Sequence, residues 1–440
     1  MSYREPMPLF ARKKPVSEPV AEPEVEAPLP ERTAEEQLAT VLDGVEPLRP
    51  FGMQINDVSG LTLCEDIVSD IDLPIVSTAR VAGYGIRAAN IVGATELHPI
   101  DLRVVGVVER RDTLPTEGVA AGGCVLLAEG APAPKGVDAV VPLGDAQLTG
   151  RVVTFCTEAK LHQNLSVRGS ALADGAKLLD ADTVLNPRSI SLLAEIGLDK
   201  VLVRPQPRLV VFSVGAGLVA PGLPLTSISQ HYAAATSLIT ALARGDGATV
   251  YALDIVSRDA ATIRQTIADQ VIRADAMVVL AETDTDVHLV AELLPAIGQL
   301  DRARVLFNGG QPVATGRVGD DRCPVLVLPA GPVTAFAAYH VLIRPLLDRL
   351  GARDASPAPR RRVRLASGMR GDETGPRYVP AVLNASGEAS PVSVGSELAY
   401  ELHRADVLAI IPCGARLDAG AEVECLVLDE GAGAAPTASE

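Results

Sequence analysis

The chain lacks tryptophan altogether, and aromatic residues make up only 3% of its 440 residues. Aromatic side chains are the platforms on which proteins stack nucleic-acid bases, so their scarcity argues against that function. Basic residues are also in deficit, because 39 Lys and Arg stand against 55 Asp and Glu, for a formal net charge of −16. This charge repels phosphate backbones and acidic lipid surfaces. We therefore expect no nucleic-acid partner.

Long apolar runs and closely spaced cysteines are missing as well. No stretch of eighteen apolar residues exists, and the N-terminus has no apolar core of a secretion signal. We therefore expect no direct membrane insertion and a cytoplasmic location. The cysteines stand singly along the chain, which argues against a zinc knuckle or a redox pair and predicts reduced core thiols. They are Cys64, Cys124, Cys156, Cys323, Cys413 and Cys425.

Hydrophobic residues make up 48% of the chain, enough for several cores, and a chain of this length is expected to divide into domains. The order Thr33-Ala34-Glu35-Glu36 is a capping box and predicts that a helix begins there. From Arg208 onward apolar strands alternate with helices, which predicts a doubly wound α/β domain. Short apolar runs between turn residues predict β-rich units on either side of it.

The expected organisation has five parts. Residues 1–32 are rich in Pro and Glu and predict a disordered leader. The other parts are a helical and linking domain over 33–70 and 157–205, an inserted β-rich domain over 71–156, the α/β domain over 206–352, and a C-terminal β-barrel-like domain over 360–430. The fold class is therefore multidomain α/β.

This order of parts resembles the MoeA and gephyrin E-domain family, the molybdopterin molybdenumtransferases, and several motifs agree. Asp72-Leu73-Pro74 followed by Gly83-Tyr84-Gly85-Ile86-Arg87 matches the spacing of the family's Asp-Leu-Pro and Asp-Gly-Tyr-Ala-Val-Arg segments. Leu328-Pro329-Ala330-Gly331-Pro332-Val333 stands for Leu-Pro-Gly-Asn-Pro-Val. Further matches are 130–141, 213–219, Tyr378-Val379-Pro380, Gly395-Ser396 and 405–412. The resemblance implies the family's fold.

Several polar positions of the family pattern are replaced in this chain. The acid of Asp-Gly-Tyr is Ala82, and an Asp-Glu pair is Ala216-Gly217. A loop rich in glycine, which would admit phosphate, aligns with 281–286, where Glu282, Asp284 and Asp286 would repel it. Lys-Pro-Gly-Lys-Pro has become 308–312, without a positive charge. We therefore expect no catalytic residues, no metal site and no cofactor.

The resemblance to gephyrin then implies a non-catalytic homodimeric scaffold that binds the peptide tail of a protein partner. The matching positions are Glu35 and Leu38 on the first helix, Pro412 in the last domain, and Tyr378 nearby. Divergent bacterial relatives include cell-division scaffolds, so we expect the C-terminal tail of the tubulin-like protein FtsZ as partner. Leu38 fits core packing equally well, and Glu35 also fits a capping acid.

Two other functions remain open. The chain is a molybdopterin molybdenumtransferase, with Mg²⁺ and molybdopterin in its site, if the cation is held by Asp284 and Asp286 instead. An enzyme with a new activity in the same cleft is the third possibility. The run Glu282 to His288 alternates oxygen and nitrogen donors, but a helix start is the simpler interpretation. His231 has no acid nearby in sequence to orient it, which favours a structural histidine.

Overall fold

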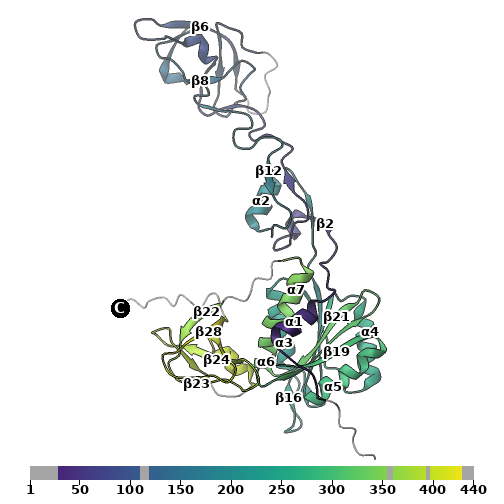
Figure 1. The fold of residues 1–440 in the computed structure, drawn as a ribbon. Coiled ribbons are helices and arrows are strands. Elements are labelled where there is room, and N and C mark those ends of the chain that lie inside the picture. The colour runs from purple at the N-terminus through teal and green to yellow at the C-terminus, as the bar shows by residue number, and fades with distance from the viewer. Residues whose placement is uncertain (1–27, 110–117, 354–359, 393–396, 429–440) are drawn as a thin grey trace, which may run out of the picture.

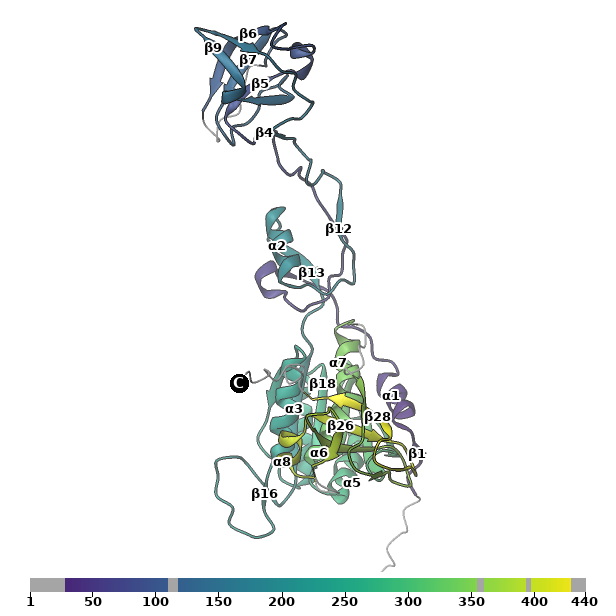
Figure 2. The ribbon, with the colours of Figure 1, turned by 90° about the vertical axis from the view of Figure 1, so that its left-hand side faces the viewer.

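The structure, a computed structural model, describes residues 28–109, 118–353, 360–392 and 397–428. The first 27 residues of the expected leader, the Gly395-Ser396 motif and the last ten residues lie outside this part. The described chain is elongated, with a large central domain, a stalk that carries a β unit, and a C-terminal β unit beside the central domain (Figure 1, Figure 2).

The central domain is built on a seven-stranded sheet in the order β1-β19-β20-β21-β18-β14-β17. Strands β14, β17, β18 and β21 run parallel, whereas β20 runs antiparallel to both neighbours. The sheet is therefore mixed. Its strands are β1 (Glu31–Arg32), β14 (Arg208–Val214), β17 (Thr249–Ala252), β18 (Ala276–Ala281), β19 (Gly298–Val305), β20 (Gln311–Val318) and β21 (Cys323–Pro329).

Helices cover both faces of this sheet, as a doubly wound fold requires. Successive residues of β14 point to opposite faces, so Leu209 and Val211 enter one core and Val210 and Phe212 the other. The first core lies under α1 (Ala34–Leu42), α3 (Ala234–Gly245), α6 (Pro332–Ala338), the π-helix η5 (Tyr339–Ile343) and α7 (Arg344–Leu350). The second lies under α4 (Ala260–Val271), α5 (Asp284–Leu293) and η4 (Leu294–Ala296). The expected multidomain α/β fold class is confirmed.

The first helix departs from the expected domain organisation. The capping box is present, because Glu36 N–H donates to Thr33 Oγ1 and Thr33 N–H donates to the Glu36 carboxylate. However, α1 packs on the central domain, where Val41 is fully buried, and not on the linking domain over 33–70. The preceding strand β1 pairs with β19, so the last residues of the expected leader of 1–32 belong to the central sheet. We attribute the position of α1 to the burial of its apolar side chains in the larger core of the central domain.

The stalk consists of paired segments that leave the central domain and return to it. Its base contains β2 (Phe51–Gln54), η1 (Ile55–Asp57), α2 (Pro187–Glu195) and β13 (Lys200–Val203), packed around one small core. Two short antiparallel pairs continue it, β3 (Ile67–Val68) with β12 (Lys177–Leu179), and β4 (Thr78–Ala79) with β11 (Leu165–Ser166). The stalk holds the inserted β unit well away from the central sheet (Figure 2).

The inserted unit is a six-stranded sheet in the order β8-β5-β7-β6-β10-β9. Gly83 and Gly85 allow close packing in its centre, since a Cβ at Gly85 would overlap Leu127. The elements are β5 (Gly83–Ile86), η2 (Ala88–Ile91), β6 (Ile100–Val108), β7 (Gly123–Leu127), β8 (Ala139–Pro142), η3 (Leu143–Asp145), β9 (Ala146–Thr149) and β10 (Val152–Phe155).

The C-terminal unit is a five-stranded sheet in the order β22-β28-β26-β24-β25, with an additional two-stranded pair. Tyr378, Leu408 and Leu426 from this unit join the core of the central domain, which fixes the unit beside α6. The elements are β22 (Arg360–Arg364), β23 (Met369–Arg370), β24 (Arg377–Leu383), β25 (Ala389–Pro391), α8 (Ala399–Arg404), β26 (Val407–Ile411), β27 (Arg416–Leu417) and β28 (Glu422–Val427).

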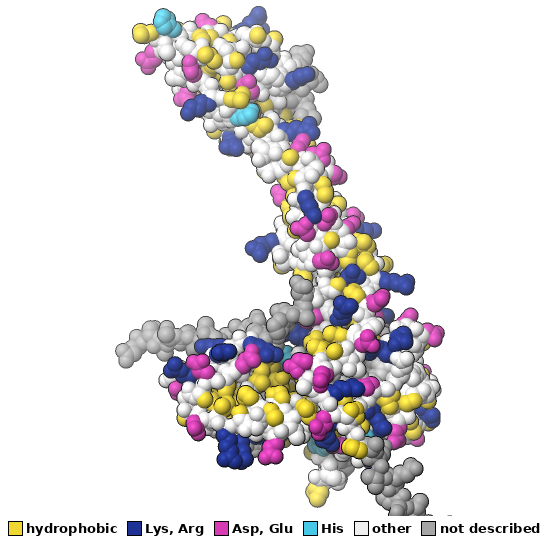
Figure 3. All heavy atoms as spheres, viewed as in Figure 1, with side chains coloured by type: hydrophobic (Ala, Val, Ile, Leu, Met, Phe, Trp, Pro, Cys, Tyr) yellow, Lys and Arg dark blue, Asp and Glu magenta, His cyan; other side chains and the backbone are white. Residues whose placement is uncertain are grey.

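Acidic and basic side chains are interspersed over the face shown in Figure 3, so the net negative charge does not gather in one patch there. Among the described residues, no helix combines the length and the apolar character that a bilayer crossing requires.

Candidate functional site

The carboxyl ends of β14, β18 and β21 form one edge of the central sheet. Ligands of doubly wound folds bind at this edge. Val214 pairs with Ala281, and Ala281 pairs with Pro329, so the loops that follow these three strands are neighbours. The first loop contains the turn 215–217, the second begins with Glu282, and the third contains 330–331.

Glu282 extends from the end of β18 into the turn after β14. The backbone N–H of Gly217 donates a hydrogen bond of 2.8 Å to Glu282 Oε2. A Cβ atom at Gly215 or at Gly217 would overlap the Glu282 side chain. Both positions therefore require glycine while Glu282 keeps this conformation. The Glu282 side chain is only 13% exposed.

His231 lies beside this carboxylate. It belongs to β16 (His231–Tyr232), which pairs with β15 (Leu218–Val219), and its Nδ1 atom is 3.8 Å from Glu282 Oε1. The sequence showed no acid near His231, but the fold supplies one from another strand. The hydroxyl of Ser229 is hydrogen-bonded to that of Ser227 at 2.9 Å. Among the described residues no hydrogen bond joins Ser229 to His231, so a nucleophile–base pair is not assembled.

The acidic run after β18 begins a helix, as the sequence predicted. Thr283 caps α5, and the buried Asp286 completes the capping box. Asp286 accepts a hydrogen bond of 2.7 Å from the Thr283 hydroxyl and pairs with Arg258 Nε at 2.5 Å. Asp284 is exposed, whereas the carboxylate of Asp286 is already engaged by Thr283 and Arg258. Within the described ranges, no three His, Cys, Asp or Glu side chains cluster as metal ligands.

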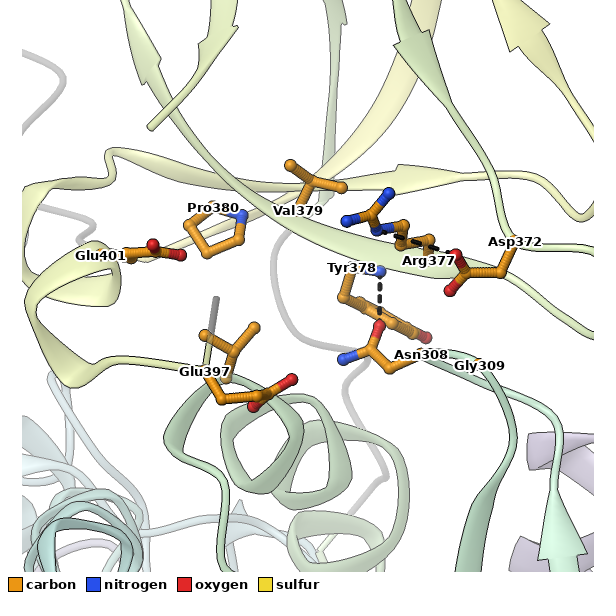
Figure 4. A pocket seen from close by; sticks show the side chains of 10 residues that line it. Asn308, Gly309, Asp372, Arg377, Tyr378, Val379, Pro380, Glu397 and Glu401 are labelled. Carbon is orange, nitrogen blue, oxygen red and sulfur yellow. Dashed lines mark hydrogen bonds and ion pairs between the residues drawn. The ribbon is translucent and has the colours of Figure 1, made fainter. Parts of the chain in front are cut away.

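A cavity of about 240 Å³ lies where the C-terminal unit meets α6 (Figure 4). It continues from the same sheet edge, because Val333 follows the loop after β21. Arg377 and Asp372 form an ion pair of 3.8 Å at one side of the cavity. The cavity is lined by Asn308, Gly309, Val333, Asp372, Arg377, Tyr378, Val379, Pro380, Glu397 and Glu401.

Three polar side chains connect the walls of this cavity. Asn308 Oδ1 accepts the Tyr378 N–H at 2.8 Å, and Asn308 Nδ2 donates to Thr334 Oγ1 at 3.3 Å. Thr334 in turn donates to both carboxylate oxygens of Glu397, through its N–H at 2.8 Å and its hydroxyl at 3.0 Å. Burial of the carboxyl group raises the pKa of Glu397, although these hydrogen bonds oppose the rise.

The four residues expected to bind a partner peptide lie in and around this region. Tyr378 is buried with its ring edge-on to Phe307 at 6.4 Å, and Leu38 packs partly buried against the same core. Burial raises the pKa of Tyr378, and the nearby exposed Glu35 adds to this rise. Ile411 pairs with Arg377, so the exposed Pro412 lies beside the start of β24. A partner-binding role for these residues stays a prediction.

Ala82 lies far from the other replaced positions. It is exposed in the inserted unit, directly before β5, at the opposite end of the molecule from the strand edge. Ala216 and Gly217 lie in the turn after β14, and Asp284 begins α5. A single chain therefore brings Ala216, Gly217 and Asp284 to one edge, and does not bring Ala82 there.

Two family profiles match the chain. The MoeA N-terminal region (domain I and II) matches residues 32–197, and the MoeA C-terminal region (domain IV) matches residues 362–428. Together these regions cover more than half of the chain. The chain is 28% identical to molybdopterin molybdenumtransferase 1 of Mycobacterium tuberculosis over 418 residues, which is 87% of this chain and 96% of that protein. It is also 28% identical to molybdopterin molybdenumtransferase 2 of that organism over 327 residues, 72% of this chain and 79% of that protein.

A solved structure shows the same fold. The chain superposes on the MoeA molybdopterin biosynthesis protein from Pyrococcus horikosii with a TM-score of 0.80 and 24% identity, covering 90% of this chain and 99% of that one. The class defined by this fold is a multidomain α/β protein with a mixed central sheet and β half-barrel units. The chain belongs to the MoeA family.

The comparisons contradict the expected function. We expected a non-catalytic scaffold of bacterial cell division that binds the tail of FtsZ, but the relatives matched over most of their length are named as enzymes. The expectation of no enzymatic activity was therefore wrong. That expectation was based on replaced residues, each considered at its own position. In the structure, the carboxylate of Glu282, which follows β18, reaches the turn 215–217 that has lost its own acids.

Proposed function

We propose that this protein is a molybdopterin molybdenumtransferase, which inserts molybdenum from molybdate into adenylylated molybdopterin. The observation that carries the proposal is the similarity to molybdopterin molybdenumtransferase 1 of Mycobacterium tuberculosis, which extends over 96% of that protein. A partial match would support only a shared domain, whereas this match includes every unit of the fold.

The arrangement of the strand edge is compatible with this activity. The ligand-binding edge of the sheet and the adjoining cavity offer glycine turns, backbone N–H groups and the carboxylates of Glu282 and Glu397. Mg²⁺ takes oxygen ligands, usually one or two carboxylates together with oxygens of a phosphorylated substrate. The donors present therefore fit Mg²⁺, which would screen the negative charges of the two substrates. Molybdopterin and molybdate are substrates in this proposal.

The proposal includes a homodimer, as the family resemblance implies. The inserted unit with Ala82 stands far from the strand edge of its own chain (Figure 2). If both regions contribute to one cleft, they must come from two copies. Light scattering on the purified chain at micromolar concentration should give twice the mass of the chain. A monomer at these concentrations would contradict this part of the proposal.

The test of the activity is reconstitution. The purified full chain is incubated with adenylylated molybdopterin, molybdate and Mg²⁺, and the product is transferred to an apo-enzyme that requires the molybdenum cofactor. We expect activation that depends on the chain and on molybdate. The Mycobacterium tuberculosis relative provides the positive control. Activation by that relative with none by this chain, at equal protein concentration, would reject the proposal.

A further inference from the structure

Strand β22 forms one edge of the C-terminal sheet and is rich in arginine. Its sequence is Arg-Arg-Arg-Val-Arg. Only β28 pairs with it along Arg360–Arg364, and among the described residues no strand covers its other side before Leu365 bridges to Ala389. Basic side chains lie along this part of the C-terminal unit (Figure 1, Figure 3). The edge therefore offers free backbone groups beside a row of positive charge.

The backbone of the even-numbered residues of β22 faces the open side. The N–H of Leu365 donates a hydrogen bond on the side of β28, whereas the N–H of Ala366 donates on the opposite side, toward β25. Because successive N–H groups along a strand point to opposite edges, those of Arg360, Arg362 and Arg364 face the same way as that of Ala366. These three residues can therefore pair with a further strand.

The side chains on this edge select the charge of such a strand. Arg360 pairs with Glu424 at 3.2 Å and Arg364 with Glu422 at 3.7 Å, and the four side chains are 46–69% exposed. Ion pairs this exposed are weak, so the arginines can accept further carboxylates on their free side. Like charges directly opposite each other destabilise a pair of strands. The edge therefore disfavours a second copy of β22 and favours an acidic strand.

The leader of this chain contains an acidic segment with a matching alternation, residues 16–26. Its glutamates all stand at even positions, its two prolines stand at odd positions, and it has no basic residue. In an extended strand, alternate residues share one face for their side chains and one edge for their N–H groups. If the even residues face β22, every glutamate lies on the face of the arginines, and both prolines, which have no N–H, lie on the outer edge. The residues are Glu18, Glu22, Glu24 and Glu26, with Pro19 and Pro23.

The leader has the length to lie along β22 of its own chain. Burial is the main cause of the raised pKa of Tyr378, and the charge of Arg360 opposes this rise whereas that of Glu35 adds to it. Exposed charges are largely screened beyond about 10 Å, so β22 begins near the start of α1. Glu22 precedes Pro28, the first described residue, by six positions. An extended chain of this length spans about 20 Å.

We propose that the leader segment 16–26 adds to β22 of its own chain as an antiparallel edge strand, with its glutamates beside the arginines. Peptides that add to a sheet edge obtain affinity from main-chain hydrogen bonds and selectivity from alternate side chains. A segment that orders only on such binding loses conformational entropy, so we expect the docking to be reversible. This inference does not depend on the transferase function.

Hydrogen exchange of the full chain, resolved to single amides, tests the docking. We expect the N–H groups of Arg362 and Arg364 to exchange about tenfold more slowly in the wild type than in a variant with all four leader glutamates changed to glutamine. The N–H of Leu365 is the internal control, because it bonds on the side of β28 in either case and should be unchanged. Higher salt should reduce the protection of the two arginines in the wild type.

Two proline variants separate strand pairing from charge attraction. In the proposed alignment, Glu22→Pro removes an N–H that faces β22, whereas Ala21→Pro removes one that faces away. We expect Glu22→Pro to speed the exchange of Arg362 and Ala21→Pro to leave it as in the wild type. Glu22→Gln removes the charge alone and should have a smaller effect than Glu22→Pro. Equal effects of the two proline variants would overturn the alignment.

The other possible states of this edge give different results, each of which would overturn the proposal. Rapid exchange of Arg362 and Arg364 in the wild type would show that the edge is open. Protection that persists in the four-glutamine variant would mean that another segment covers it. Protection that is lost when the wild type is diluted would assign the added strand to a second copy of the chain.

Discussion

The hydroxyl of Thr334 donates a hydrogen bond of 3.0 Å to Glu397 Oε1, which links α6 of the central domain to the C-terminal unit. The backbone N–H of the same threonine donates to the second carboxylate oxygen. Thr334 is 2% exposed, so its hydroxyl has little access to water. One buried side chain therefore helps to position the wall of the cavity in Figure 4.

Replacing Thr334 by valine should loosen this junction. The variant keeps the shape of the side chain, but removes the donor to Glu397 and the acceptor for Asn308. We expect the free energy of unfolding to fall by about 1–3 kcal/mol, because Glu397 and the half-buried Asn308 each lose one hydrogen bond. Urea denaturation measures the effect. Thr149→Val, at an exposed position of β9, is the control and should change stability little.

Variants of Asn308 can separate the contribution of its side-chain hydrogen bonds to stability from that of its backbone conformation. Its φ of 45° lies in the left-handed region, and its side chain bonds both Tyr378 and Thr334. Asn308→Gly removes only the side-chain bonds, whereas Asn308→Ala also strains the backbone, by about 1 kcal/mol. We expect both variants to unfold at lower urea concentration, with alanine the less stable. Equal stability of the alanine variant and wild type would show that these bonds contribute nothing.

His340 should make the protein sensitive to acid. Burial and the neighbouring Arg344 lower the pKa of His340 from 6.5 to about 4. The unfolded chain therefore takes up a proton before the folded chain does, so the stabilisation present above pH 6.5 is lost as the pH falls toward 4. Urea midpoints at pH 7 and pH 4.5 should differ less in His340→Gln than in the wild type.

The control for this prediction is His98→Gln, since His98 is exposed in the inserted unit. That variant should keep the wild-type difference between the two pH values. Burial raises the pKa of Asp348, which gives a slope of the opposite sign, with stability lost as the pH rises. Asp348 is present in the wild type and in both variants, so its contribution does not affect the comparison. An unchanged pH difference in His340→Gln would contradict the assignment.

Local signals in the sequence predicted much of the architecture. The capping box at Thr33 marks the start of α1, and the apolar run at 209–213 marks a strand buried on both faces. The alternation of strands and helices did not predict β20, because Pro312 and Gly316 interrupt its apolar pattern. The two-residue strand β1 carries too few residues for any periodicity.

The contacts of the candidate site could not be predicted from the sequence, for a different reason. Gly217 and Glu282 are separated by 65 residues, and only the register of β14 against β18 brings them together. When the chain is compared with the family pattern one position at a time, an acid is missing at 217 and an acid stands at 282 where the pattern has none. In the fold the two changes meet in one turn. The prediction about enzymatic activity was wrong because the sequence alone does not show that these two positions are in contact.

The ion pair behind the same edge gives the last prediction. Asp286 is 1% exposed, and Arg258 is the basic residue paired with it. Arg258→Met leaves a buried carboxylate with the Thr283 hydroxyl and N–H groups only. We expect a loss of about 2 kcal/mol in unfolding free energy, below the value for a fully buried pair because Arg258 is partly exposed.

The double variant Arg258→Met with Asp286→Asn should recover part of that loss, because the buried group is then neutral. Urea denaturation of the wild type, the single variant and the double variant measures the recovery. A double variant less stable than Arg258→Met alone would show that the carboxylate is needed chiefly as the partner of Thr283 in the α5 cap. The end of β18 would then depend on that cap more than on the charge of Arg258.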